Sequence, residues 1–127
     1  MLIVDAANVI GARPDGWWRD RPGATARLVG RLRGAELADV VVVVEGAARS
    51  GVSPGGDDTL RVVHAPGSGD DTIVSLVAEA AGREGASDVT VVTADRALRT
   101  RVRELGADVI GPNWLYQRLP EDGSAPR

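Results

Sequence analysis

The sequence contains no cysteine, no phenylalanine and no lysine. Without cysteine the chain forms neither disulfides nor thiolate metal sites, which fits a reducing compartment, and we expect a cytoplasmic protein. No charged start followed by an apolar run opens the chain, so we expect no signal peptide. The longest apolar run, residues 40–44, is too short to cross a membrane, and we expect no membrane partner.

The positively charged side chains of the sequence are all of one type. All fifteen basic residues are arginine, and eighteen acids bring the net charge to −3, which disfavours non-specific binding to a polyanion. Residues 1–33 hold six arginines and three acids, residues 34–95 three arginines and eleven acids, and residues 96–127 six arginines and four acids. On charge alone, scattered solvated charge is the simpler interpretation. An acidic metal site with a basic rim is the alternative.

Hydrophobic residues make up 43% of the 127 residues, which is enough for the core of one ordinary domain. Apolar β-branched runs predict strands, while helical periodicity bounded by capping residues predicts helices. The expected strands are 1–5, 40–44, 60–65, 89–93 and 109–110. The expected helices start at 22, at 70 or 71, at 95 and at 112, and end near 34, at 82 or 85, near 106 and at 119. Loops fill 6–20 and 46–58, although a short helix could lie within 47–58.

Strands that alternate with helices and are apolar throughout are typical of a parallel sheet covered on both faces. The sequence therefore predicts an α/β protein, a three-layer α/β/α sandwich with a mainly parallel sheet. We expect one domain over residues 1–119 and a frayed tail over 120–127.

Each of the four main strands is followed by a carboxylate. Asp5 ends the first strand, Glu45 follows the second, Asp70 and Asp71 open the helix after the third, and Asp95 lies two residues past the fourth. The carboxyl ends of parallel strands meet at one edge, where ligands bind at the point of strand-order reversal. If the first strand is central with the fourth beside it, Asp5 and Asp95 face each other there.

Such a cluster is unfavourable without a cation, because two carboxylates about 5 Å apart repel by roughly 3 kcal/mol at an effective dielectric near 20. A hard divalent cation removes the repulsion, and oxygen ligands suit Mg²⁺ or Mn²⁺. A metal held in this way is suited to phosphodiester hydrolysis. Structural roles stay open beside this one, since Asp5 could accept from loop amides and Asp95 could cap a helix. The candidate metal ligands are Asp5, Asp95, Asp70, Asp71 and Glu45.

Three motifs resemble a known family. The opening Leu2-Ile-Val-Asp5-Ala-Ala-Asn8-Val-Ile-Gly11 resembles that of NYN domains, a branch of the PIN-like nuclease superfamily, and within it the YacP-like ribonucleases. The segment Val91-Val-Thr-Ala-Asp95-Arg96-Ala-Leu98 resembles their second acidic motif. Gly69-Asp70-Asp71-Thr-Ile73 resembles the acidic helix start between the two.

This resemblance runs over residues 1–119 and implies a PIN-like fold with the first strand central. It also implies a metal-dependent endoribonuclease that hydrolyses RNA phosphodiester bonds with Mg²⁺ or Mn²⁺. The residues that carry over as catalytic are Asp5, Asn8, Asp70 and Asp95. One departure is Glu45, because such domains often have aspartate at the end of the second strand.

Arginines interleaved with aromatic residues suit RNA, through phosphate contacts and base stacking. Arg13, Arg19 and Arg21 surround two adjacent tryptophans, of which at most one is expected to pack inward. A solvated face for the arginines and a lid over the core for the tryptophans are the alternatives. The candidate RNA-binding residues are Arg13, Arg19, Arg96, Arg99, Arg103 and Trp17. The partner could be mRNA, tRNA or rRNA, or the ribosome, and we expect a monomer or a weak homodimer.

Other enzyme classes with this order of elements are disfavoured. Phosphatases of the haloacid dehalogenase type and two-component receivers need a lysine. Dinucleotide binding needs a glycine-rich turn after the first strand. The single histidine, His64, is expected to be structural. Two alternatives remain open: a non-catalytic RNA- or ribosome-binding module with the same fold, and a toxin-type ribonuclease with a protein inhibitor.

Overall fold

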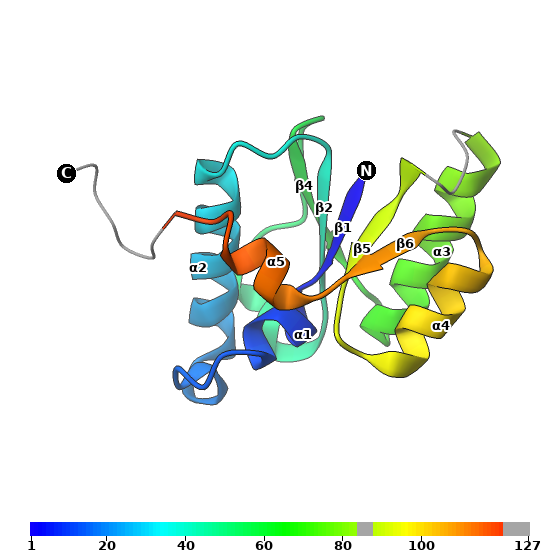
Figure 1. Ribbon diagram of the computed structural model, residues 1–127. Coiled ribbons are helices and arrows are strands. Elements are labelled where there is room, and N and C mark those ends of the chain that lie inside the picture. Colours follow the sequence, from blue (N-terminus) through cyan, green and yellow to red (C-terminus); the bar gives the residue numbers. More distant parts are fainter. Residues whose placement is uncertain (84–87, 121–127) are drawn as a thin grey trace.

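The computed structural model describes residues 1–83 and 88–120. Within them a six-stranded sheet has the order β3-β4-β2-β1-β5-β6, and every strand except β3 pairs in parallel (Figure 1). The predicted α/β class and mainly parallel sheet are thus confirmed. The strands are β1 (Leu2–Asp5), β2 (Val40–Val44), β3 (Gly55–Gly56), β4 (Leu60–His64), β5 (Thr90–Val92) and β6 (Asp108–Ile110).

Helices cover both faces of the sheet, with α1, α2 and α5 on one side and α3 and α4 on the other (Figure 1). This arrangement is the predicted three-layer sandwich. None of the described helices is long and apolar enough to cross a membrane. The helices are α1 (Ala6–Gly11), α2 (Arg21–Gly34), α3 (Gly69–Arg83), α4 (Arg96–Glu104) and α5 (Pro112–Tyr116), with 3-10 turns η1 (Trp17–Arg19) and η2 (Gly46–Gly51).

The five consecutive valines of β2 show why the sequence forms this sandwich. All five are buried, and their side chains alternate between the two layers. Val40, Val42 and Val44 belong to the core under α2, while Val41 and Val43 belong to the core under α3 and α4. β-Branched side chains suit a strand that is covered on both faces.

Strand β1 is central, because it pairs with β2 on one side and with β5 on the other. From β1 the chain first builds the sheet outward through β2 and β4, then returns to the other side of β1 to add β5 and β6. The strand order therefore reverses between β1 and β5, which is where α/β proteins bind ligands. The predicted central position of the first strand is confirmed.

Local elements differ from the sequence prediction in three places. The expected loop 6–20 contains helix α1 and the turn η1, and the expected loop 46–58 contains the short edge strand β3. The turn η2 spans Gly46–Gly51, close to the short helix that the sequence allowed within 47–58. Either Asp70 or Asp71 was expected to start α3, but the helix begins at Gly69 and both lie in its first turn. The Ser68 hydroxyl accepts a hydrogen bond from the Asp71 amide. Residues 121–127 of the predicted tail, and the alternative helix end at residue 85, lie outside the described residues.

Candidate functional site

Asp5 lies at the junction of β1 and α1, and only 5% of its surface is exposed. One carboxylate oxygen, Oδ1, accepts a 3.4 Å hydrogen bond from the Asn8 amide and so caps α1. The other oxygen, Oδ2, accepts a 2.9 Å hydrogen bond from the hydroxyl of Thr93, which is fully buried. The carboxylate is therefore held from both sides at the end of the central strand.

The Thr93 hydroxyl links Asp5 to Asp95. It donates to Asp5 and accepts a 3.1 Å hydrogen bond from the Asp95 amide. Asp95 in turn caps α4, since its Oδ1 accepts from the Leu98 amide at 2.9 Å. The structure thus brings Asp5 and Asp95 to the two sides of the switch point, as the sequence predicted. Sequence reasoning missed Thr93, whose signal is a hydroxyl directly after buried strand residues and two positions before an acid.

Asn8 also acts across the switch point. Its side-chain oxygen accepts a 2.7 Å hydrogen bond from the Ala94 amide, which joins α1 to the loop between β5 and α4. Asn8 therefore positions the backbone between Thr93 and Asp95.

Glu45 and Asp70 bring two further carboxylates to this edge. Glu45 follows β2, and its Oε2 accepts a 2.9 Å hydrogen bond from the Gly69 amide at the start of α3. A Cβ atom at Gly69 would lie 3.1 Å from Glu45 Oε1, so glycine leaves room for the carboxylate. Asp70 is half-buried in the first turn of the same helix.

The surroundings at this edge raise the pKa of two of its carboxyl groups. Burial raises the pKa of Asp5 to about 6, hydrogen bonds from Thr93 and Asn8 oppose the rise, and the charges of Asp70 and Glu45 add to it. Burial is also the largest cause of the raised pKa of Asp70, and the charges of Asp95 and Glu45 raise it further. The positive charge of Arg101 lowers this pKa by a smaller amount. Four acidic side chains from separate parts of the sequence therefore form one electrostatically coupled cluster. We name Asp5, Glu45, Asp70 and Asp95 the carboxylate cluster.

Asp71 lies next to the carboxylate cluster, and its charge also adds to the raised pKa of Asp70. Its side chain is exposed and forms a 3.1 Å ion pair with Arg101. Among residues 1–83 and 88–120, no ion pair involves a member of the carboxylate cluster. The acids at the switch point are thus not neutralised by direct pairing with arginine in this part of the chain.

The donor chemistry of the cluster fits a hard divalent cation, because every side-chain donor is a carboxylate oxygen. As the described side chains stand, no three acids or histidines form a group that would enclose a metal. Two of the carboxylates instead cap α1 and α4, and Glu45 accepts from the α3 backbone. Mg²⁺ does not need an enclosing cage, since it keeps several waters and is bound through one or two carboxylates plus substrate phosphates.

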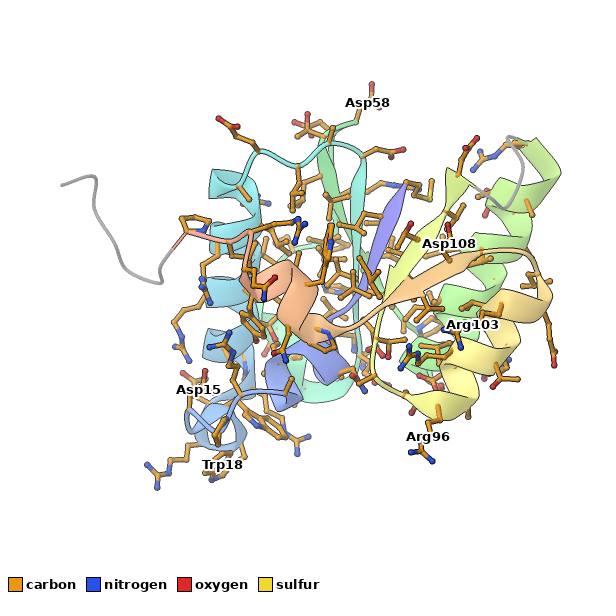
Figure 2. The ribbon with its side chains drawn as sticks, in the orientation of Figure 1. Asp15, Trp18, Asp58, Arg96, Arg103 and Asp108 are labelled. Carbon is orange, nitrogen blue, oxygen red and sulfur yellow. The ribbon has the colours of Figure 1, made fainter. Side chains whose placement is uncertain are left out.

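The predicted RNA-binding residues are spread over both layers. Arg13 stacks over the ring of Tyr116 at 4.0 Å, and Arg19 lies 5.9 Å from the ring of Trp18. In Figure 2, Trp18 and Arg96 lie at the end of the molecule where β1 passes into α1, and Arg103 lies further along α4. Arg99 has a buried Nε with no hydrogen-bond partner among the described residues.

The two adjacent tryptophans differ as expected. Trp17 packs partly against the core below α2, whereas Trp18 is 52% exposed. His64 is held by a 2.8 Å contact between its Nε2 and the Val52 carbonyl, in line with the structural role predicted for it.

A central β1, strand-order reversal beside it and helices on both faces define an α/β protein with a PIN-like fold. Among solved structures, the chain is similar to a crystal structure of Rae1 (YacP) from Bacillus subtilis, with a TM-score of 0.59 and 21% sequence identity. The match covers 91% of this chain and 72% of that chain, and it shows that the two chains share a fold. No protein-family model matches the chain. No curated protein matches it in sequence either.

Proposed function

We propose that this chain is a metal-dependent endoribonuclease of the YacP-like NYN branch, hydrolysing RNA phosphodiester bonds at the carboxylate cluster. The observation that carries the proposal is that four carboxylates lie at this edge without an ion pair to arginine among the described residues, with the pKa of the buried Asp5 raised to about 6 by burial. Folding does not favour such an arrangement unless a cation compensates for the charge. The shared fold with Rae1 (YacP) and the three motif resemblances support the same conclusion.

In this proposal Asp5 and Asp95 hold Mg²⁺ or Mn²⁺, and Asp70 and Glu45 contribute charge or contacts through water. A bound divalent cation supplies Lewis-acid charge at the phosphodiester and favours deprotonation of the attacking water. A direct metal contact by Asp71 is not part of the proposal, because that side chain pairs with Arg101.

The protein's own side chains position these groups. Thr93 orients the Asp5 carboxylate, and the α4 cap orients Asp95. Asp70, half-buried and with a raised pKa, accepts a proton from the attacking water. The water oxygen bonds to phosphorus, the bond from phosphorus to the leaving oxygen breaks, and solvent supplies the proton of the leaving group. Asn8 keeps the two sides of the switch point together.

RNA is the proposed partner, with arginines at the rim contacting phosphates. A ribosome that presents the RNA is a further partner of the same kind, which co-sedimentation with ribosomes measures. A toxin-type ribonuclease would share the chemistry of the cluster and additionally bind a protein inhibitor.

The test uses a fluorescent single-stranded RNA and compares wild type with Asp5→Asn and Asp95→Asn in Mg²⁺, in Mn²⁺ and in EDTA. We expect cleavage by wild type only with metal and a loss of roughly 100-fold or more in each variant. Asp58→Asn is the matched control, because Asp58 is exposed at the opposite end of the molecule (Figure 2). Binding of Mn²⁺, followed by calorimetry, should weaken in the same two variants and not in the control.

Equal cleavage by wild type and both variants would remove the cluster from the mechanism. RNA binding without cleavage under any metal condition would instead favour the non-catalytic module.

A further inference from the structure

A pocket of about 210 Å³ lies directly beside the carboxylate cluster, on the α2 side of the sheet. Its walls include Ala7 of α1, Trp17 of η1, Arg21 of α2 and Ala48 of η2. Glu45 lines the same pocket and also belongs to the carboxylate cluster. Glu45 is therefore shared between the pocket wall and the edge at which the proposed chemistry takes place.

The size of the pocket limits what it can hold. Pockets for drug-sized ligands measure about 300–1,000 Å³. The volume of about 210 Å³ is smaller, so it suits a single ring system better than a whole nucleotide. A ligand of this size at the cluster would be one part of a longer molecule whose remainder lies outside.

The chemistry of the walls matches a flat heteroaromatic ring. The Arg21 guanidinium lies 5.4 Å from the centroid of the Trp17 ring, so a π-face and a planar cation occur together. Bases of single-stranded RNA stack on aromatic rings and on arginine planes. Ala7 and Ala48 supply small apolar surface beside them.

Among the described residues, Glu45 is the one acid in a wall that also includes the polar residues Arg21 and Thr25. Its Oε2 accepts from the Gly69 amide, and a carboxylate has further lone pairs that can accept from another donor. The N–H groups at the edge of a nucleobase are donors of this kind. A purely apolar ring would make no use of these lone pairs.

We propose that this pocket binds one unpaired nucleobase of an RNA strand whose neighbouring phosphodiester lies at the carboxylate cluster. The inference rests on the proposed function for its choice of RNA, and it narrows the substrate to single-stranded RNA. A base paired within a duplex is stacked and cannot enter, so duplex RNA is a poor substrate.

The test measures RNA binding in EDTA, where no metal-dependent cleavage takes place. The probe is a fluorescein-labelled single-stranded oligoribonucleotide, compared with a set in which one nucleotide at a time is abasic. Trp17→Leu removes the stacking surface. Ala7→Leu fills the pocket from an exposed helix position, so it keeps the test valid if Trp17→Leu impairs folding. Trp18→Leu is the matched control, because Trp18 is exposed and does not line the pocket.

We expect Trp17→Leu and Ala7→Leu to raise Kd about tenfold or more, and Trp18→Leu to change it less than about twofold. One abasic position should weaken binding to wild type by a similar factor and should add little to the effect of Ala7→Leu. Wild-type affinity in folded Ala7→Leu, or equal tolerance of every abasic position, would overturn the proposal.

The two proposals fail separately in this design. If Asp5→Asn still cleaves RNA while the pocket variants lose RNA affinity, the nuclease assignment falls and the base pocket stands. If Asp5→Asn abolishes cleavage while the pocket variants bind RNA as wild type does, the base pocket alone falls.

Discussion

Replacing Asp5 with asparagine should make the metal-free protein more stable at neutral pH. The folded state raises the pKa of this carboxyl from 3.8 to about 6, mainly through burial. Each pKa unit corresponds to about 1.4 kcal/mol, so ionised Asp5 lowers the free energy of unfolding by roughly 3 kcal/mol. Asparagine removes that charge but accepts weaker hydrogen bonds from Thr93 and Asn8. We therefore expect a net gain of about 1–3 kcal/mol.

The gain should depend on pH in a defined direction. Folded Asp5 has the higher pKa, so between pH 3.8 and about 6 the native state binds more protons than the unfolded state. Wild-type stability then falls as pH rises through this window, and Asp5→Asn does not show that fall. The advantage of the variant should be smallest near pH 4 and largest above pH 7.

Urea unfolding followed by tryptophan fluorescence measures this difference in EDTA. With a slope of about 1–3 kcal/mol per molar urea, the expected gain shifts the midpoint by on the order of 1 M. Asp58→Asn, at an exposed position, should stay within about 0.5 kcal/mol of wild type. A variant at position 5 that is less stable than wild type at pH 7.5, or a difference that is constant from pH 4 to 8, would refute the reasoning.

Three further outcomes are expected from the same site and its surroundings. Mg²⁺ or Mn²⁺ at about 100 times its Kd should stabilise wild type by about 3 kcal/mol and should stabilise Asp5→Asn or Asp95→Asn clearly less. Equal metal-induced shifts in melting temperature for all three proteins would contradict this expectation. Thr93→Val removes the hydrogen bond to Asp5, so it should raise the pKa of Asp5 further and lower the free energy of unfolding by about 1–3 kcal/mol at pH 7.5. Thr93→Ser keeps the hydroxyl and should keep most of the stability, and urea unfolding measures both variants. Gly51→Ala places a Cβ against the Pro22 carbonyl oxygen and should destabilise by about 1–3 kcal/mol. At Gly30, an exposed helix position, an added Cβ meets nothing within 4 Å, so Gly30→Ala should stabilise the protein by about 0.5–1 kcal/mol. The melting temperatures of Gly51→Ala and Gly30→Ala should therefore shift in opposite directions.

The strongly patterned parts of the chain were predictable, and the short elements were not. The valine run of β2 and the periodic apolar positions of α2, α3 and α4 identify their own structure, because burial on one or both faces needs them. Helix α1 has only six residues, so its inward Val9 and Ile10 do not complete a recognisable period. The sequence indicated that Asp5 could accept from amides of the following segment, but not that this segment is a helix. Strand β3 consists of Gly55 and Gly56, which have no strand propensity and pair only because β4 lies beside them.

The site was predictable to the level of which strand ends meet, and no further. Asp5 and Asp95 lie near each other as expected, because Asp5 ends β1, Asp95 follows β5 and these two strands are neighbours. The roles of Thr93 and Glu45 depend on individual hydrogen bonds between segments about 88 and 24 positions apart. Spacing along the chain carries no information on such contacts. The pocket likewise depends on η1 and η2, whose short turns leave little trace in the sequence.

The hydrogen bonds around the switch point are concentrated between β1 and β5. Asp5, Thr93, Asp95 and the Asn8–Ala94 contact join the end of β1 and helix α1 to the segment that follows β5. The start of α3 is joined to the end of β2 by the Glu45–Gly69 hydrogen bond, and its Ile73 and Val77 belong to the core on that face. In the proposed reaction an RNA phosphate at this edge would therefore meet side chains that the fold already holds in place on both sides of β1.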